Sequence, residues 1–253
     1  MGHYKNNIRI IPSLLLKNKR LVKGKVFKDF IDAGDPIKTC VAHDSQYCDE
    51  ISIIDLDAYH NKVEPDYETL KLINKEINTP ILFGGNINNI KIVEKLIKNG
   101  ADKVLINSNL FSTNIALEVI NNFGKQALVG GVDLFYKENK YYVYQNGKLL
   151  NINYLQYIKN VIELGVGEIK ITFVKKEGTR KGFDIEEANK ISKTSQVPII
   201  FEGGIKNLQN ILDAITNNVN AIAIGSLLIF SDNNIFKVKQ FLDNRNIKVR
   251  LRF

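Results

Sequence analysis

The chain has 253 residues, of which 44% are apolar, and it carries a formal net charge of +8 at pH 7. This length suits one large domain, and no apolar run approaches the ~18 residues needed to cross a bilayer. The polar first residues lack the apolar segment of a signal peptide, so we expect a cytoplasmic protein without a membrane partner. The positive charge favours an anionic ligand, but no basic cluster with interleaved aromatic residues predicts binding to nucleic acid.

The elements expected along the chain alternate between apolar strands and amphipathic helices. Two of the helices are residues 90–97 and 155–162, followed by Gly100 and Gly165 as typical helix ends. The eight expected strands are residues 8–16, 51–57, 80–85, 103–108, 127–135, 168–174, 198–204 and 221–230. Such alternation predicts an α/β fold, a single (β/α)8 TIM barrel spanning residues 1–253. A doubly wound open sheet is the alternative, but it seldom needs eight similar units.

The two halves of the chain repeat each other. Residues 80–87 (PILFGGNI) match residues 198–205 (PIIFEGGI), and Ser108 has its counterpart 118 residues later in Ser226. The repeat predicts a barrel built from two equivalent half-barrels of four strands each.

Two insertions interrupt the alternation after the first and the fifth strand. Residues 18–35 are expected to form a long basic loop, and residues 135–150 a β-hairpin that turns at Asn146 and Gly147. Both insertions leave the C-terminal ends of strands, which is the face where barrel enzymes hold their active sites.

Turns rich in glycine follow four strands at equivalent positions of the two halves. Such turns let backbone N–H groups approach an anion closely. The first half contributes Gly84, Gly85, Asn86, Asn107 and Ser108, and the second half Gly203, Gly204, Gly225 and Ser226. We predict two phosphate sites for a phosphorylated small molecule, with tighter binding in the second half because Asn86 crowds the first. The alternative is a set of tight turns without a ligand.

Acidic residues at strand ends are candidates for proton transfer. Asp133 ends the fifth strand and is the first candidate, whereas Asp55 and Asp57 end the second strand. Asp55 suits a catalytic role and a loop-capping role equally. The loop after the sixth strand contains Gly178 and Thr179, which either contact a phosphate or a sugar hydroxyl or belong to an exposed flexible loop.

The sequence contains no pattern typical of a disulfide bond or a zinc site. Cys40 and Cys48 form neither a C-x-x-C motif nor a disulfide framework, and the three histidines lack the spacing of a zinc site. We therefore expect no metal and no cofactor.

Charged residues immediately precede four of the strands. They are Arg9, Glu50, Lys103 and Glu168. Because a closed barrel brings the starts of its parallel strands to one rim, these residues are expected to form a ring at the N-terminal mouth. On the residues alone, charges at that face are more typical of stability than of function, and coincidence is a further alternative.

Several segments together resemble the HisF family, the cyclase subunits of imidazole glycerol phosphate synthase, over essentially the whole chain. They are RIIPSLLLKNKRLVKG, DAGDP, FGGNI, GADKVLINS, EGTRKGFD and PIIFEGG. The resemblance implies a heterodimer with a HisH-like glutaminase, which docks at the N-terminal mouth and sends ammonia through the barrel to a bis-phosphorylated substrate. It also implies that the four ring residues gate the ammonia and that Asp102 faces the glutaminase.

The resemblance fails at one of the two catalytic aspartates of that family. Asp133 matches the aspartate of the fifth strand, but Leu15 replaces the aspartate of the first strand. Further departures are Ser13, Asn86, Lys175, Glu177 and Glu202. Loss of one of two proton-transfer groups typically costs ~10²–10⁴ in rate, so Leu15 predicts a changed reaction.

This combination resembles HisF-like paralogues linked to acetamidino modification of bacterial surface sugars. We therefore predict a subunit that passes ammonia through its barrel to support a separate sugar amidotransferase in lipopolysaccharide or flagellar glycan synthesis. The first alternative is a cyclase subunit of histidine biosynthesis whose missing acid is supplied by another group. The second alternative is a scaffold without catalysis that only activates its glutaminase.

Overall fold

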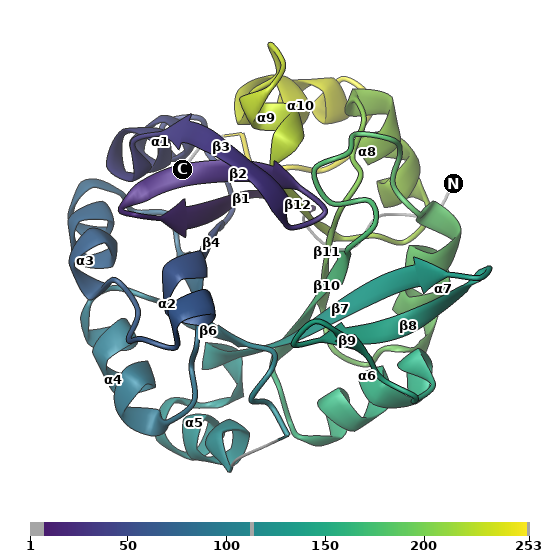
Figure 1. The fold of residues 1–253 in the computed structure, drawn as a ribbon. Helices are drawn as coiled ribbons and strands as arrows, with labels where there is room; N and C mark the ends of the chain where they lie inside the picture. The colour runs from purple at the N-terminus through teal and green to yellow at the C-terminus, as the bar shows by residue number, and fades with distance from the viewer. Residues whose placement is uncertain (1–7, 112–113, 252–253) are drawn as a thin grey trace.

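A computed structural model describes residues 8–111 and 114–251, and within them eight parallel strands close into a barrel (Figure 1). The barrel strands are β1 (Arg9–Lys17), β4 (Ile51–Asp55), β5 (Ile81–Gly84), β6 (Lys103–Ile106), β7 (Leu128–Lys137), β10 (Glu168–Phe173), β11 (Ile199–Glu202) and β12 (Ala221–Ile224). They pair in the order β10-β11-β12-β1-β4-β5-β6-β7, and β10 also pairs with β7, which closes the sheet. The predicted (β/α)8 barrel is confirmed.

Helices surround the barrel (Figure 1). They are α1 (Pro36–Asp44), α2 (Leu56–Asn61), α3 (Tyr67–Glu76), α4 (Ile90–Lys98), α5 (Ile115–Phe123), α6 (Tyr154–Glu163), α7 (Ile185–Thr194), α8 (Leu208–Thr216), α9 (Ser226–Ile229) and α10 (Ile235–Asp243), with a 3-10 turn at Lys125–Ala127. Asn89 caps α4 and Asn207, 118 residues later, caps α8 through the same kind of bond to a backbone N–H. The matching caps agree with the repeat between the half-barrels. No helix in the described part of the chain is both long and apolar enough to span a membrane.

The barrel interior is partly polar. Alternation along β10 sends Ile169, Ile171 and Phe173 into the large apolar cluster beneath the helices. The other face of β10 points inward and carries Glu168, Lys170 and Thr172, all of them buried. A smaller inner cluster fills the rest of the interior with Ile11, Leu82, Val129, Ile200, Ala221 and Ala223. The inner layer therefore combines apolar side chains with a column of polar side chains on one strand.

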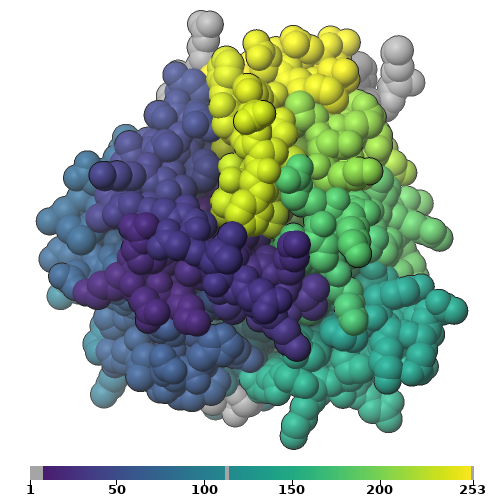
Figure 2. All heavy atoms as spheres, turned by 45° about the horizontal axis from the view of Figure 1, so that its top comes forward, coloured from purple at the N-terminus to yellow at the C-terminus, as the bar shows by residue number. Residues whose placement is uncertain are grey.

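The first insertion is a β-ribbon, and the prediction of a loop at residues 18–35 was wrong. The antiparallel strands are β2 (Arg20–Lys25) and β3 (Lys28–Gly34), and β2 pairs with the end of β1. The buried run of β2 is only four residues long. Exposed charged residues flank it and continue along β3, so the sequence shows no apolar pattern typical of a strand. The ribbon, purple in Figure 2, lies beside the yellow C-terminal segment.

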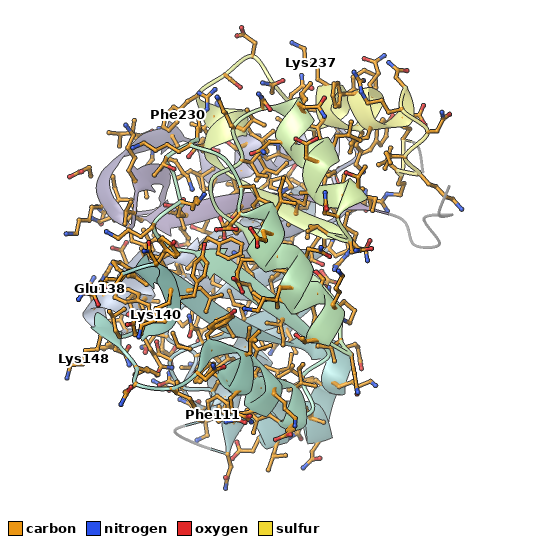
Figure 3. All side chains as sticks on the ribbon, turned by 90° about the vertical axis from the view of Figure 1, so that its right-hand side faces the viewer. Phe111, Glu138, Lys140, Lys148, Phe230 and Lys237 are labelled. Atoms are coloured by element: carbon orange, nitrogen blue, oxygen red, sulfur yellow. The ribbon has the colours of Figure 1, made fainter. Side chains whose placement is uncertain are left out.

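The second insertion forms the predicted hairpin, with a different main turn. β7 runs into β8 (Lys140–Gln145) through Glu138 and Asn139, and Asn146–Gly147 then joins β8 to the short β9 (Lys148–Leu149). Figure 3 shows the tip of this extension, marked by Glu138, Lys140 and Lys148, projecting on the same side of the barrel as Phe230.

Two expected strands end earlier than the sequence predicts. β4 ends at Asp55, so that Asp57 lies in the first turn of α2. β12 ends at Ile224, and Ser226–Ile229, with three apolar residues after the serine, form α9. In both places apolar residues continue past the strand because the first turn of the following helix also contains buried residues, Leu56 and Ala58 in α2 and Leu227 in α9.

Candidate functional site

Four charged side chains form a closed ring at the N-terminal mouth of the barrel. Lys103 Nζ lies 2.6 Å from Glu50 Oε2 and 2.9 Å from Glu168 Oε2. Arg9 Nη1 lies 3.3 Å from Glu50 Oε2, and Arg9 also pairs with Glu168. Each cation therefore contacts both glutamates, in the arrangement that the strand starts predict. The role of this ring as an ammonia gate stays a prediction.

Burial and charge compete at the two glutamates of the ring. Burial raises the pKa of Glu50 against the lowering effect of Lys103 and Arg9. Burial also acts upward on Glu168, but the hydrogen bonds and charges of Arg9 and Lys103 outweigh it and lower its pKa. Glu50 Oε1 is buried without a hydrogen-bond partner. The mouth therefore offers one acceptor to a molecule that donates hydrogen bonds.

The surface around the ring is grooved. A cavity of about 870 Å³ is lined by Arg9, Lys103 and Glu168, together with residues that start β11 and β12. Asp102 is exposed beside Lys103, and its Oδ2 accepts the Ile81 N–H at 2.8 Å. This hydrogen bond holds the start of β5. Asp102 also remains exposed at the N-terminal mouth, where the glutaminase is predicted to bind.

The opposite mouth opens into a cavity of about 900 Å³, and Asp133 lies in its wall. Asp133 Oδ2 accepts a hydrogen bond from Asn107 Nδ2 at 2.9 Å. Burial raises the pKa of Asp133 to about 6, against the lowering effect of Lys170 and of hydrogen bonds from Thr172 and Asn107. A carboxyl group that titrates near neutral pH is suited to proton transfer. The cavity also exposes the predicted residues Gly85, Asn86, Asn107 and Ser108.

Leu15 lines the same cavity and makes hydrophobic contacts there. On β1 it pairs with Val22 of the adjacent strand β2, and it packs with Val22 and Leu56 in a small hydrophobic cluster. The position that holds a catalytic aspartate in the resembling family therefore anchors the ribbon here. A carboxylate at this position would lose that contact.

Lys170 crosses the barrel interior. β10 and β4 lie four strands apart in either direction around the barrel, yet Lys170 Nζ reaches to 3.2 Å from Ser52 Oγ on β4. It also lies 2.8 Å from Glu202 Oε2 on β11. Lys170 is 3% exposed and Glu202 is 7% exposed. Because Lys170 also lines the 900 Å³ cavity, its side chain forms part of the floor that separates this cavity from the ring below.

The turns of the second half enclose much less space than those of the first. Gly204, Gly225 and Ser226 border a cavity of about 20 Å³, which Lys23 and Glu177 also line. Lys23 and Glu177 form an ion pair, and both are nearly inaccessible to solvent. The predicted residues of the second half therefore come together, but around a buried lysine.

The loop after β10 is held by the ribbon. Gly178 has a φ of +73°, and a Cβ on it would overlap the carbonyl oxygen of Gly24 in β2. Thr179 Oγ1 donates to the carbonyl oxygen of Lys176 at 2.8 Å, and the Val26 N–H donates to the Glu177 carbonyl oxygen at 3.0 Å. These contacts explain the glycine and the threonine locally, and their contact with a ligand stays a prediction.

Asp55 has a structural role in the described geometry. Its Oδ1 accepts the Ala58 N–H at 2.9 Å, and its Oδ2 accepts the Asp66 N–H at 2.8 Å. Both oxygens are thus used to start α2 and to hold the loop before α3. Of the two readings of Asp55, loop capping is the one that the hydrogen bonds support.

Sequence reasoning missed Lys23 and Lys170. A signal for Lys170 was present, because Glu168, Lys170 and Thr172 alternate with apolar residues along one expected strand. In a closed barrel such alternation places a charge in the interior. Lys23 lay in the segment expected to be a loop, so nothing in the sequence indicated its burial.

Comparisons with known proteins agree with the fold. A model of the family described as "Histidine biosynthesis protein" matches residues 9–234. Among curated proteins, the chain is similar to "Imidazole glycerol phosphate synthase subunit HisF" of Hydrogenobaculum sp. (strain Y04AAS1). The two are 35% identical over 248 residues, which cover 96% of this chain and 98% of that relative. The match therefore extends over both mouths of the barrel.

Proposed function

This chain belongs to the histidine biosynthesis protein family, and we propose that it is the synthase subunit of a glutamine-dependent complex. It receives ammonia from a HisH-like glutaminase at the N-terminal mouth and passes it through the barrel. The ammonia serves amidination, the acetamidino modification of a bacterial surface-glycan sugar, which a separate sugar amidotransferase completes.

The charged ring at the N-terminal mouth carries this proposal. Lys103 and Arg9 each hold both glutamates, so a shift of Lys103 opens the ring on one side. Ammonia donates hydrogen bonds, and Glu50 Oε1 is a buried acceptor without a partner at this mouth. The groove beside the ring and the exposed carboxylate of Asp102 supply a surface for the glutaminase.

A molecule that passes the ring next meets Lys170. Its Nζ, together with Ser52 Oγ and Glu202 Oε2, offers donors and acceptors that can exchange hydrogen bonds with ammonia. Because Lys170 spans the interior, its side chain has to move before ammonia enters the upper cavity. There Asp133, with its pKa raised to about 6 by burial, is the group that accepts or donates a proton.

Leu15 supports a reaction other than the family's cyclisation. A leucine transfers no proton, and this position now belongs to the hydrophobic contact that anchors the ribbon. A cyclase without one of its two proton-transfer groups is expected to lose ~10²–10⁴ in rate.

The second candidate function is the cyclase subunit of imidazole glycerol phosphate synthase in histidine biosynthesis. The name of the 35% identical relative supports it. Glu202 supports it too, since this buried carboxylate lines the same cavity as Asp133 and offers a replacement for the missing acid. Under this reading Glu202 and Asp133 are the two proton-transfer groups.

Isolation of the complex from the native cell separates the candidates. An affinity-tagged chain is purified at low ionic strength, and its partners are identified by mass spectrometry. A glutaminase together with a larger amidotransferase is the expected result. Recovery of neither protein contradicts the proposal. In a parallel test, complementation of a strain lacking HisF favours the cyclase function, and failure to complement favours amidination.

A further inference from the structure

The positive charge of the chain is concentrated on three extensions at the C-terminal mouth. They are residues 18–35 with the ribbon, residues 135–150 with the hairpin, and residues 174–184 after β10. These segments contain 12 lysine and arginine residues against six aspartate and glutamate residues, so they carry +6 of the chain's net charge of +8. They make up fewer than one fifth of the residues, and the remainder of the chain is nearly neutral.

Contacts join the three extensions into one surface. The loop after β10 contacts the ribbon on one side, where the Val26 N–H donates to the Glu177 carbonyl oxygen at 3.0 Å. On its other side, Lys175 Nζ lies 4.7 Å from the centre of the Phe135 ring in the hairpin extension. A molecule that covers the C-terminal mouth therefore meets all three extensions together.

Six lysines of this surface are exposed, and none of them pairs with a carboxylate in the described part of the chain. Arg20 and Lys137, by contrast, pair with Asp32 and Glu138. Figure 3 shows two of the unpaired lysines, Lys140 and Lys148, at the tip of the hairpin. We call the six lysines the basic rim. They are Lys25, Lys28, Lys140, Lys148, Lys175 and Lys181.

The basic rim lies outside the ligand cavity. None of its six lysines lines the 900 Å³ space, whose lining lysines are Lys62 and Lys170. A small anion held in that cavity therefore makes no contact with the rim. The charge of the rim is placed to act on a partner that is large enough to extend over the mouth.

Large apolar side chains are exposed beside the basic rim. Ile31 on the ribbon and Tyr136 and Leu149 on the hairpin extension are 37–55% exposed. Phe230 is 41% exposed, and its carbonyl oxygen accepts a hydrogen bond at 3.0 Å from Arg180 of the loop after β10. Exposed aromatic and aliphatic side chains among charged residues are typical of a surface that binds another protein.

A protein with an acidic surface fits this mouth better than a nucleic acid does. Asp29 and Glu138 are exposed among the lysines of the rim, and both would repel a phosphate backbone. The proposed function also requires a protein at this place. Ammonia that leaves an open mouth takes up a proton from water at neutral pH and is then no longer a nucleophile, so the enzyme that uses it has to cover the cavity.

We propose that the basic rim docks an acidic surface of the sugar amidotransferase, which thereby covers the mouth of the 900 Å³ cavity. The lysines steer its approach, and the exposed apolar side chains pack against it. This inference rests on the proposed function for the existence of that enzyme, and it adds where the enzyme binds. The glutaminase and the amidotransferase then occupy opposite mouths and bind at the same time.

Two matched double variants of the full chain test the rim. Lys140→Glu with Lys148→Glu reverses two charges of the rim, and Lys71→Glu with Lys159→Glu reverses two exposed lysines of α3 and α6. Their affinities for the amidotransferase that co-purifies with the wild-type chain are measured by biolayer interferometry. The rim variant should bind about tenfold more weakly or worse, and the control should change less than twofold. Added salt should weaken binding to the wild-type chain, because exposed charges are screened.

Zero-length cross-linking locates the contact. A carbodiimide joins a lysine amine to a carboxylate only where the two groups touch, so peptides that link rim lysines to acidic residues of the amidotransferase are expected. Cross-links confined to other faces of the barrel, or equal losses in the two double variants, would overturn the proposal. Tighter binding of duplex DNA than of the amidotransferase to the wild-type chain would overturn it as well.

Recovery of the glutaminase distinguishes failure of this inference from failure of the proposed function. The glutaminase is expected at the other mouth, so both double variants should retain it. An amidotransferase that binds the rim variant as tightly as the wild-type chain would contradict this inference alone. Absence of the amidotransferase from the wild-type complex would contradict the proposed function together with this inference.

Discussion

The two mouths of this barrel have diverged to different degrees from the family that they resemble. The N-terminal mouth carries the four charged residues of the ring that the resemblance implies, and each is paired with two others. The C-terminal mouth has Leu15 where the resemblance implies a catalytic aspartate, and it contains the buried pair of Lys170 and Glu202. The proposed function assigns entry of the nitrogen source to the first mouth and a changed chemistry to the second.

Both mouths contain buried charges, and burying a charge lowers the stability of the folded chain unless the charge is paired. Removing two charges from water costs several kcal/mol per ion, roughly repaid by their mutual attraction. Ion pairs of this kind are weak evidence for stability. Under the proposed function, their presence inside the barrel reflects contact with a polar molecule that passes or binds there.

The largest expected effect is on catalysis and concerns Leu15. With ammonium salts, the wild-type chain should convert the family's bis-phosphorylated substrate no better than ~10⁻² as fast as the Leu15→Asp variant, which restores a proton-transfer group opposite Asp133. The measurement is product formation under saturating ammonium at equal protein concentration.

Leu15→Asn is the control for this prediction. Asparagine has nearly the size and polarity of aspartate but does not transfer a proton at neutral pH, so it should give no gain. Robust conversion by the wild-type chain would contradict the changed chemistry of the C-terminal mouth.

The next effect is on stability and concerns the buried ion pair of Lys170 and Glu202. Lys170→Met keeps the length of the side chain but leaves Glu202 buried without its partner, so the free energy of unfolding should fall by about 3–5 kcal/mol. The double variant Lys170→Met with Glu202→Met should recover most of this loss. Urea unfolding measures both. A Lys170→Met chain as stable as the wild type would show that Glu202 is neutral or finds another partner.

A smaller effect follows from the pKa of Asp133. Its folded pKa is about 6, and its unfolded pKa is expected near the ordinary value of about 3.9. Between these values the folded chain binds more protons, so the contribution of Asp133 to stability falls as the pH rises from about 4 to about 6. Relative to Asp133→Asn, the wild-type free energy of unfolding should drop by roughly 2–3 kcal/mol over that range. A difference that is constant with pH would show that burial does not raise this pKa.

The smallest expected effect concerns nitrogen transfer at the N-terminal ring. Lys103→Ala should lower glutamine-dependent product formation several-fold, by roughly 1 kcal/mol in the barrier, and change ammonium-dependent formation much less. Lys91→Ala, an exposed lysine of α4, is the matched control. Equal losses with both nitrogen sources would show that Lys103 supports the fold and not the transfer.

The sequence predicted the parts of this molecule that depend on local pattern. Strand and helix alternation specified the barrel, and residues at the starts of strands specified the ring, because closure alone brings them together. It did not predict the burial of Lys23, since this depends on a ribbon folding back over the C-terminal face. It did not predict the span of Lys170 to Ser52 either, because that contact joins opposite walls of the closed barrel.

The transfer of nitrogen through the barrel is measured most directly by isotope competition. The complex recovered from the native cell is supplied with glutamine labelled with ¹⁵N in its amide group and with a tenfold excess of unlabelled ammonium. If ammonia passes from the glutaminase through the charged ring, most of the nitrogen in the product should be ¹⁵N whatever the ammonium concentration. A labelled fraction that falls to the ratio of the bulk solution would show that ammonia reaches the acceptor from solvent and would contradict the account.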